Sequence, residues 1–486
     1  MDLDLRSVVA SLAAVASGGL ASFVLTNPRT HAWAIMASER EVDRWVDSQP
    51  VAIAVGVVVA VAVAGLLGRY GTRRMAWVLA AIAVAVICGA VAIVKDIGSV
   101  DALIATNTVK TVAAGVLLGS AIAALASLLP RLALVLGILM GFATASVGVA
   151  ARSSESIGLL QETTSAAGEP PWWLLIAAVV LCVICAGLGT THLHHHYHAT
   201  ETPGPDTSDA ATAEDGSVMR DDNTELLIAL AVAIGIAVLH RVLASWVDGY
   251  AFGGGIGPWV SVFVSLLLIG IVVIVAAKAL GYANGRLILA TTGIAAAAAI
   301  MFQDLRHPLA EASTGLVLLV ITLAAAVGLA FAARWDRPEW GLLVVALIPL
   351  VAAIAPEFGT GGFLLYLRLA VFGVGAGFAM GAALPPFSSA TALGLGLPFI
   401  AFLFPAIAVS TRTLAGPDAI RYAPDTDLIA VPHFDDSWGT YLGAASLLAV
   451  VLFCAAGLAR RSPIEPDAHE NDADPAHPSP NPEPNQ

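Results

Sequence analysis

Continuous apolar runs of about 20 residues recur along the chain, and they leave few folds open; the run "VAIAVGVVVAVAVAGLLG" at 51–68 is typical. A helix needs about this length to cross the hydrocarbon core of a bilayer. Lipid offers no hydrogen-bond partners to a backbone, so a spanning segment is either a helix or part of a closed barrel. Barrel strands are short and alternate in polarity. The sequence therefore predicts an all-α polytopic membrane protein.

Composition supports this prediction and excludes other classes of protein. Hydrophobic residues make up 58% of the 486 residues and charged residues only 12%, against about a quarter charged in soluble proteins. The net charge is −13, and the acidic residues gather in the polar segments between the runs. Nucleic-acid binding needs a basic face, so we expect the lipid bilayer as the main partner and no nucleic acid.

About fourteen runs qualify as spans, with ends uncertain by a few residues. We therefore expect about 12–14 transmembrane helices in two bundles. The runs lie near 5–26, 49–68, 75–95, 110–129, 132–151, 171–191, 225–247, 258–280, 287–303, 312–333, 340–356, 363–384, 390–410 and 438–459.

A polar segment divides the chain after the first six runs. We predict an N-terminal six-helix bundle at 1–191, a His-rich and acidic linker at 192–224, and a C-terminal bundle of about eight helices at 225–460. The tail at 461–486 is rich in Pro, Asp and Asn. Neither polar segment has apolar periodicity, so both are expected to be disordered.

The orientation follows from basic residues in the short connections. Lys and Arg favour the cytoplasmic side of a membrane. We expect a multi-pass protein of the cell membrane with both termini and the linker in the cytoplasm, and a first run that is retained because no basic segment precedes it. The inner connections then carry Arg69, Arg73, Arg74, Arg131, Lys278, Arg286, Arg334 and Arg337.

The connection between the second and third runs reads "AGLLGRYGTRR" at 64–74. Judged by residue type alone, it is a tight glycine turn whose arginines hold it at the cytoplasmic headgroups of the bilayer. It also resembles the inner loop between helices two and three of major facilitator superfamily transporters, roughly G-x-L-A-D-R-x-G-R-R-[KR]. Ala64 and Gly68 depart from that pattern, where the family has Gly and Asp. The matching residues are Leu66, Arg69, Gly71, Arg73 and Arg74.

This resemblance implies a secondary-active transporter, a permease or exporter, that moves a small molecule by alternating access between two bundles. It implies no enzymatic activity and no cofactor, and it leaves substrate and oligomeric state open. We expect the second-half counterpart of the loop in "KALGYANGRL" at 278–287, and the two spans beyond a twelve-helix core at the C-terminal end.

Ionisable residues inside the spans are the candidate cavity residues, because charge at membrane depth is costly and marks functional pathways. His240, Arg241 and Arg368 fall within apolar runs. They either line a central cavity or extend to the headgroups. Lys110 falls at the predicted start of its span and is expected to be an anchor.

Five histidines in "THLHHHYH" at 191–198 directly follow a predicted helix. Neutral imidazole binds zinc, nickel or copper, but no span offers paired His, Asp or Glu ligands at helical spacing. We therefore interpret the stretch as an interdomain linker and predict no metal site. The alternative metal ligands are His192, His194, His195, His196 and His198.

Two other functions stay open at this point. The departures from the family loop and the scarcity of charge in the spans fit a non-transporting membrane scaffold or envelope-assembly protein. Glu39, Glu41 and Asp43 in an early outer segment fit, loosely, a membrane-embedded enzyme that modifies sugars or lipids. The same segment, "EREVDRWVD", also fits a solvated helix.

Overall fold

In the computed structural model, the described residues are 5–26, 38–93, 99–155, 170–188, 211–250, 257–304, 313–355, 362–413 and 438–461. These ranges contain helices and no strand. Twelve of the helices described are long and apolar enough to cross a membrane, and two shorter apolar helices accompany them. The predicted all-α polytopic membrane protein with 12–14 membrane helices is confirmed.

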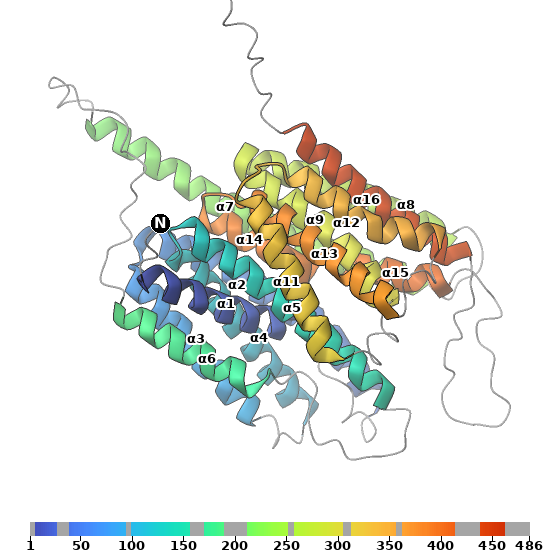
Figure 1. Cartoon of the computed structure of the whole chain (residues 1–486), viewed down its shortest axis with the longest axis horizontal. Helices are drawn as coiled ribbons and strands as arrows, with labels where there is room; N and C mark the ends of the chain where they lie inside the picture. Colours follow the sequence, from blue (N-terminus) through green and yellow to red (C-terminus); the bar gives the residue numbers. More distant parts are fainter. Residues whose placement is uncertain are drawn as a thin grey trace, which may run out of the picture.

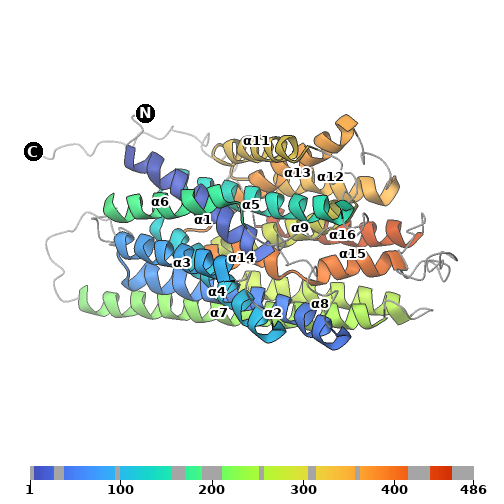
Figure 2. The same ribbon diagram turned by 90° about the horizontal axis from the view of Figure 1, so that it is seen from below.

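The helices are α1 (Leu5–Thr26), α2 (Glu39–Tyr70), α3 (Arg73–Ile93), α4 (Val100–Ala124), α5 (Leu128–Glu155), α6 (Trp172–Leu188), α7 (Ala211–Tyr250), α8 (Gly257–Ala279), α9 (Gly281–Asp304), α11 (Thr314–Ala332), α12 (Pro338–Ile354), α13 (Gly362–Ala382), α14 (Ser388–Ile400), α15 (Leu403–Thr413) and α16 (Trp438–Ala459). They lie roughly along one direction as a bundle (Figures 1 and 2). The short helices α14 and α15 share one span, Ser388–Ala408.

The same packing order occurs twice. In the first set, α1 packs on α5, α2 on α4, and α3 on α6. In the second set, α9 packs on α14, α11 on α13, and α12 on α16. Each set thus pairs its first helix with its fifth, its second with its fourth, and its third with its sixth. The two six-helix sets are therefore structural repeats, which we call the first half (α1–α6) and the second half (α9, α11–α14 with α15, and α16).

Small residues let equivalent helices approach to backbone contact in both halves. A Cβ atom added at Gly115 of α4 would overlap the carbonyl oxygen of Gly56 in α2. A Cβ at Gly377 of α13 would lie 2.5 Å from the carbonyl oxygen of Ala325 in α11. Helices in lipid gain little from hydrophobic burial, so close packing of small residues is a main source of their association.

Helices α7 and α8 have no counterpart in the first half. Helix α7 packs on α2, α8, α14 and α15, and α8 packs on α7 and α9. The two spans beyond the repeat therefore lie between the halves in sequence, and the expectation of a surplus at the C-terminal end was wrong. The polar segment at 192–224 divides the sequence, but the second repeat begins only at α9.

Two predicted helix starts also need correction. Helix α4 begins at Val100 rather than near 110, because Ser99 caps it by accepting a hydrogen bond from the Ala102 amide. Helix α7 begins at Ala211, so 211–224 is helical rather than disordered. The histidines at 192–198 and the tail after Arg461 lie outside the described residues.

The acidic segment considered for an enzyme begins α2. Ser38 donates to the Glu41 carboxylate through its amide (2.9 Å) and its hydroxyl (2.7 Å). The bond from the amide is one half of a capping box at the start of α2. These hydrogen bonds hold the pKa of the Glu41 carboxyl below its usual range. Glu41 thus serves as a helix cap, as expected for a solvated helical start.

Candidate functional site

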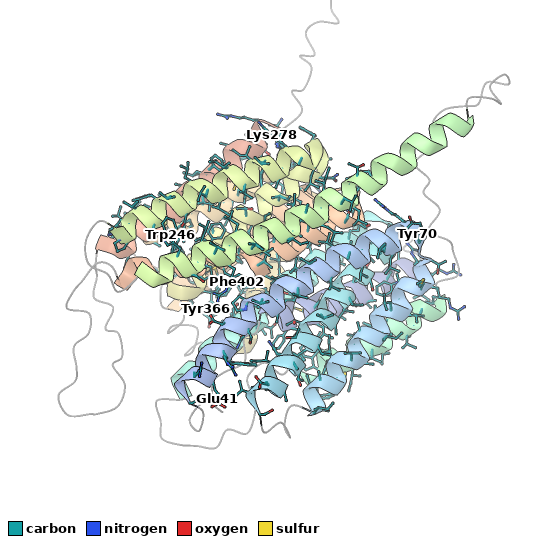
Figure 3. The ribbon with its side chains drawn as sticks, turned by 180° about the vertical axis from the view of Figure 1, so that it is seen from behind. Glu41, Tyr70, Trp246, Lys278, Tyr366 and Phe402 are labelled. Atoms are coloured by element: carbon teal, nitrogen blue, oxygen red, sulfur yellow. The ribbon has the colours of Figure 1, made fainter. Side chains whose placement is uncertain are left out.

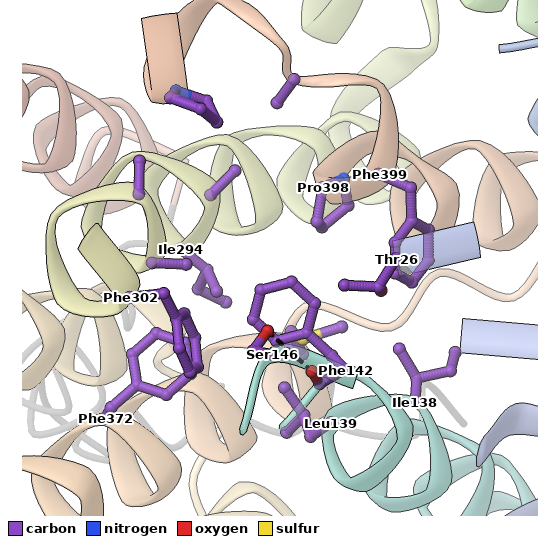
Figure 4. Close-up of a pocket in the computed structure, with 16 residues that line it drawn as sticks. Thr26, Ile138, Leu139, Phe142, Ser146, Ile294, Phe302, Phe372, Pro398 and Phe399 are labelled. Atoms are coloured by element: carbon purple, nitrogen blue, oxygen red, sulfur yellow. Dashed lines mark hydrogen bonds between the residues drawn. The ribbon is translucent and has the colours of Figure 1, made fainter. Parts of the chain in front are cut away.

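A cavity of about 350 Å³ lies between the two halves. Figure 4 shows that side chains from both halves surround it. The lining residues are Thr26, Ile138, Leu139, Phe142, Ser146, Ile294, Ala295, Ala298, Ala299, Phe302, Phe372, Met380, Pro398, Phe399, Ala401 and Pro405.

The wall of this central cavity is mainly apolar and aromatic. The rings of Phe142 and Phe302 pack edge to face at 5.1 Å, and Phe302 packs on Phe372 at 6.0 Å. The two hydroxyls in the wall donate to carbonyls of their own helices, Thr26 to Ser22 and Ser146 to Phe142. The cavity therefore offers dispersion and aromatic contacts more than hydrogen bonds.

Hydrogen bonds between the halves close one end of the cavity. Arg131, at the start of α5, donates to the carbonyl of Pro385 and to the hydroxyl of Thr391 in the second half. Ser388, the first residue of α14, donates to the carbonyl of Ala64 in α2 at 2.9 Å. We call these contacts the latch. Arg131 precedes the cavity residue Ile138 by about 10 Å of helix, so the cavity begins beyond the latch.

Comparisons with known proteins give structural likeness without sequence likeness. No protein-family model and no curated protein matches the chain. A bacterial homologue of the human drug peptide transporters PepT1 and PepT2 has a TM-score of 0.42 and 14% identity, covering 94% of this chain and 98% of that one. A D-xylose–proton symporter has a TM-score of 0.41 and 14% identity, covering 92% and 96%. A bacterial homologue of the human lysosomal transporter Spinster has a TM-score of 0.35 and 12% identity, covering 95% and 97%.

The arrangement inside the chain decides its fold. Two halves that repeat in parallel, each of six helices, enclose a cavity at their interface, as in the major facilitator superfamily. The chain thus has an all-α fold of two repeated six-helix halves, like that of the major facilitator superfamily. The resemblance seen in the loop at 64–74 is therefore matched by the architecture of the whole chain.

The loop residues that match the major facilitator pattern lie beside the latch. Arg73 donates from Nε to the carbonyl of Ala124 at 3.0 Å, so it caps the end of α4. Arg74 and Leu66 are exposed, and Arg69 is half-buried. All of these loop residues lie at the end of the molecule where the two halves are in contact.

Gly68 occupies the position at which the major facilitator loop has Asp. A Cβ at Gly68 would lie 2.5 Å from Oγ and 3.6 Å from Cβ of Ser388. The N-terminus of α14 thus packs directly on this glycine. An Asp here would have to displace the Ser388 hydroxyl, so the space for a carboxylate is already filled.

Gly71 is required for space rather than for an unusual backbone angle. Its φ of −88° and ψ of 160° are open to any residue, but a Cβ would lie 2.6 Å from the carbonyl oxygen of Leu67. We expect Gly71→Val to destabilise the purified protein by about 2 kcal/mol, as overpacking does. Thermal unfolding in detergent measures this, with Gly235→Val as the control, since no atom lies within 4 Å of a Cβ there. Equal stability of both variants would contradict the prediction.

Two of the three predicted cavity residues lie away from the central cavity. His240 is buried between α7 and α15, where its ring packs edge to face on Phe404 at 5.7 Å. Arg241 forms an ion pair of 2.6 Å with Asp47 of α2. Arg368 is buried in α13 one helical turn from the cavity residue Phe372, so it borders the cavity without appearing in its wall.

Lys110 is a residue whose importance the sequence interpretation missed. It is fully buried within α4, so it is not the anchor at a span end that was expected. Lys110 is followed by Gly115 and Gly119. Arg368 is followed at the same spacing by Gly373 and Gly377. Both helices hold fourth place in their half. The shared spacing, K-x4-G-x3-G and R-x4-G-x3-G, could have revealed this relation from the sequence. In the structure, the two buried basic residues occupy equivalent positions in the two halves.

The second-half counterpart of the loop at 64–74 is the connection of α11 to α12, because these are the second and third helices of that half. The expected counterpart at 278–287 instead joins α8 to α9. In the true counterpart, the Asp336 carboxylate accepts two hydrogen bonds from Arg286 of α9, at 2.8 and 3.2 Å.

We expect Asp336→Asn to lower the stability of the protein by about 1 kcal/mol, because Arg286 is largely buried and loses a charged acceptor. Asp101→Asn is the matched control, since the Asp101–Arg44 pair is 3.9 Å long and exposed on both sides. Thermal unfolding of both variants in the same detergent checks this. A shift as small in Asp336→Asn as in Asp101→Asn would show that the ion pair is unimportant.

Proposed function

We propose that the chain is a secondary-active transporter that moves a small, largely apolar organic anion by alternating access. The observation that carries the proposal is a cavity between two repeated halves that polar contacts close at one end. Breaking the latch while closing the opposite end would expose the same cavity to the other side of the membrane. No covalent chemistry is part of the proposal.

The orientation proposed is the latch face in the cytoplasm. This face carries Arg69, Arg73 and Arg74 at the α2–α3 loop and Arg131 at the start of α5. Basic residues in short connections favour the cytoplasmic side. Both termini of the chain would then be cytoplasmic, in the cell membrane.

The substrate class follows from the cavity wall and from buried charge. The wall offers Phe142, Phe302 and Phe372 to an apolar body. Among the described residues, the charged residues buried within the twelve long spans are Lys110, Arg286 and Arg368, and all three are positive. Arg286 is paired with Asp336, and the buried Glu339 lies at the start of the shorter helix α12. Arg368 borders the central cavity, and a positive charge beside a substrate path favours an acidic group on the substrate. An acidic group on an otherwise apolar molecule satisfies both features.

A reversible disulfide across the latch tests the proposal while the substrate is still unidentified. In the variant Gly68→Cys/Ser388→Cys, the two Cβ atoms would be about 3.6 Å apart, within the range for a disulfide. The free cysteines Cys88, Cys182, Cys185 and Cys454 are first replaced by Ala. Proteoliposomes are loaded with a small-molecule extract of the producing cells, and efflux is compared before and after reduction.

We expect at least one organic anion to leave reduced vesicles and not oxidised ones. The single variants Gly68→Cys and Ser388→Cys are the controls and should be insensitive to oxidation. If every molecule leaves reduced and oxidised vesicles equally, although the disulfide forms and breaks, the chain is not a transporter. The result would then favour a non-transporting membrane scaffold. If only neutral or cationic molecules do so, the assignment of an anion is wrong.

A further inference from the structure

A second cavity lies outside the transport path, between α2 and α7. Its volume is about 400 Å³, and apolar side chains line it apart from Arg241. Its walls include Pro50, Ala54 and Val59 of α2 and Ala237 and Arg241 of α7, together with Phe402. Those from α2 and α7 belong to spans of these helices, so the groove is at membrane depth.

The groove is a wedge that closes toward one end. A Cβ at Gly65 of α2 would overlap Leu226 of α7, so the two helices touch there. Figure 3 shows α2 and α7 close together toward Tyr70 and apart toward Glu41 and Trp246, with Phe402 between them. The wide end therefore faces away from the latch, and Phe402 forms part of the floor.

The length of the groove matches one leaflet. From Pro50 to Val59 the helix rises by about 14 Å, and one leaflet is about half of a hydrocarbon core of about 30 Å. An acyl chain that entered at the wide end would thus fill the groove to roughly the midplane. A substrate passing between the halves would not need this space.

The wide end carries one positive and one negative charge. Nη2 of Arg241 lies 2.6 Å from Oδ1 of Asp47, and the side chains are 34% and 69% exposed. A guanidinium binds phosphate through charge-assisted hydrogen bonds, and the neighbouring carboxylate would bind an ammonium group. The same carboxylate would repel a purely anionic headgroup.

We propose that this groove binds a zwitterionic phospholipid of the phosphatidylethanolamine type. One acyl chain lies along Pro50–Val59 and 234–242, the phosphate contacts Arg241, and the ammonium group contacts Asp47. The site holds a structural lipid between the first half and the α7–α8 pair. It is independent of the transport proposal, because none of its residues lines the central cavity.

A photoactivatable phosphatidylethanolamine tests the site on the unmodified full-length protein in detergent. With the reactive group on the acyl chain, we expect cross-links to concentrate at 50–59 and 234–242. The same probe with a phosphatidylglycerol headgroup should label about tenfold less. Cross-links spread evenly over lipid-facing helices such as α8, or equal labelling by both lipids, would overturn the proposal.

Substitutions give an independent result. Ala54→Trp fills the groove and should remove most of the labelling, whereas Val275→Trp, on an exposed face of α8, should leave it unchanged. Arg241→Gln should reduce the preference for the zwitterionic lipid. Labelling at the same peptides in Ala54→Trp, with the protein monodisperse on gel filtration, would show that the groove is not the site.

Discussion

A protein that carries Gly115→Val is expected not to accumulate in the membrane as folded protein. The new side chain would meet the backbone of Gly56, which cannot move without separating α4 from α2. Overpacking against side chains costs about 1–3 kcal/mol, and a clash with backbone should exceed this range. Membrane yield and a fluorescence-detected gel-filtration profile measure the loss.

Gly89→Val on α3 is the matched control, because it places the same β-branched residue in a membrane helix where nothing lies within 4 Å. It should accumulate like the unmodified protein. If both variants fold equally well, the close crossing of α2 and α4 does not hold the first half together. If both fail, valine in a membrane helix is itself the cause.

Replacing Arg131 by Gln is expected to open the latch face. The change removes a charged donor to Pro385 and Thr391, and a hydrogen bond to a charged group is worth about 1.5–3 kcal/mol. The ratio of open to closed molecules should rise at least about tenfold, since 1.4 kcal/mol is a factor of ten. Spin labels at Met75 and Trp335, both exposed, would report this as a longer distance across the face.

Arg74→Gln removes a charge from the same face at an exposed position, so it should leave the distance distribution unchanged. Arg131→Lys keeps the charge but loses the planar fork of donors, and should give an intermediate shift. An unchanged distribution in Arg131→Gln would mean that the packing of α2 on α14, rather than this arginine, keeps the face closed.

The sequence predicted the broad architecture because long apolar runs have only one solution in lipid. It placed most spans within a few residues, and it identified the loop at 64–74 as an inner connection. The structure then showed that this loop lies at the end where the halves meet. It failed for α4, since "VDALIATNTVK" contains enough polar residues to look like a loop. There, capping by Ser99 and the burial of Asn107 and Lys110 override the local polarity.

The candidate site was harder to predict than the fold, because it depends on which helices meet. Arg131 was recognised only as a basic residue of a short connection, and its partners Pro385 and Thr391 are more than 250 positions away. The cavity residues are ordinary Phe, Ile and Ala, which carry no motif. His240 and Arg241 were singled out for their charge, but that charge could not show that α7 lies outside the repeat.

Helix α12 has a consequence for the surrounding bilayer. Its 17 residues, from Pro338 to Ile354, give a rise of about 26 Å, whereas the hydrocarbon core is about 30 Å thick. This short helix exposes an apolar face to surrounding lipid, formed by Trp340, Leu343, Leu347 and Ile354. Such hydrophobic mismatch is relieved by thinning of the bilayer beside the helix or by a change in helix tilt. The protein should therefore deform thick membranes next to α12 and next to α6, which also has 17 residues and an exposed apolar face. Its conformational equilibrium should respond to acyl-chain length.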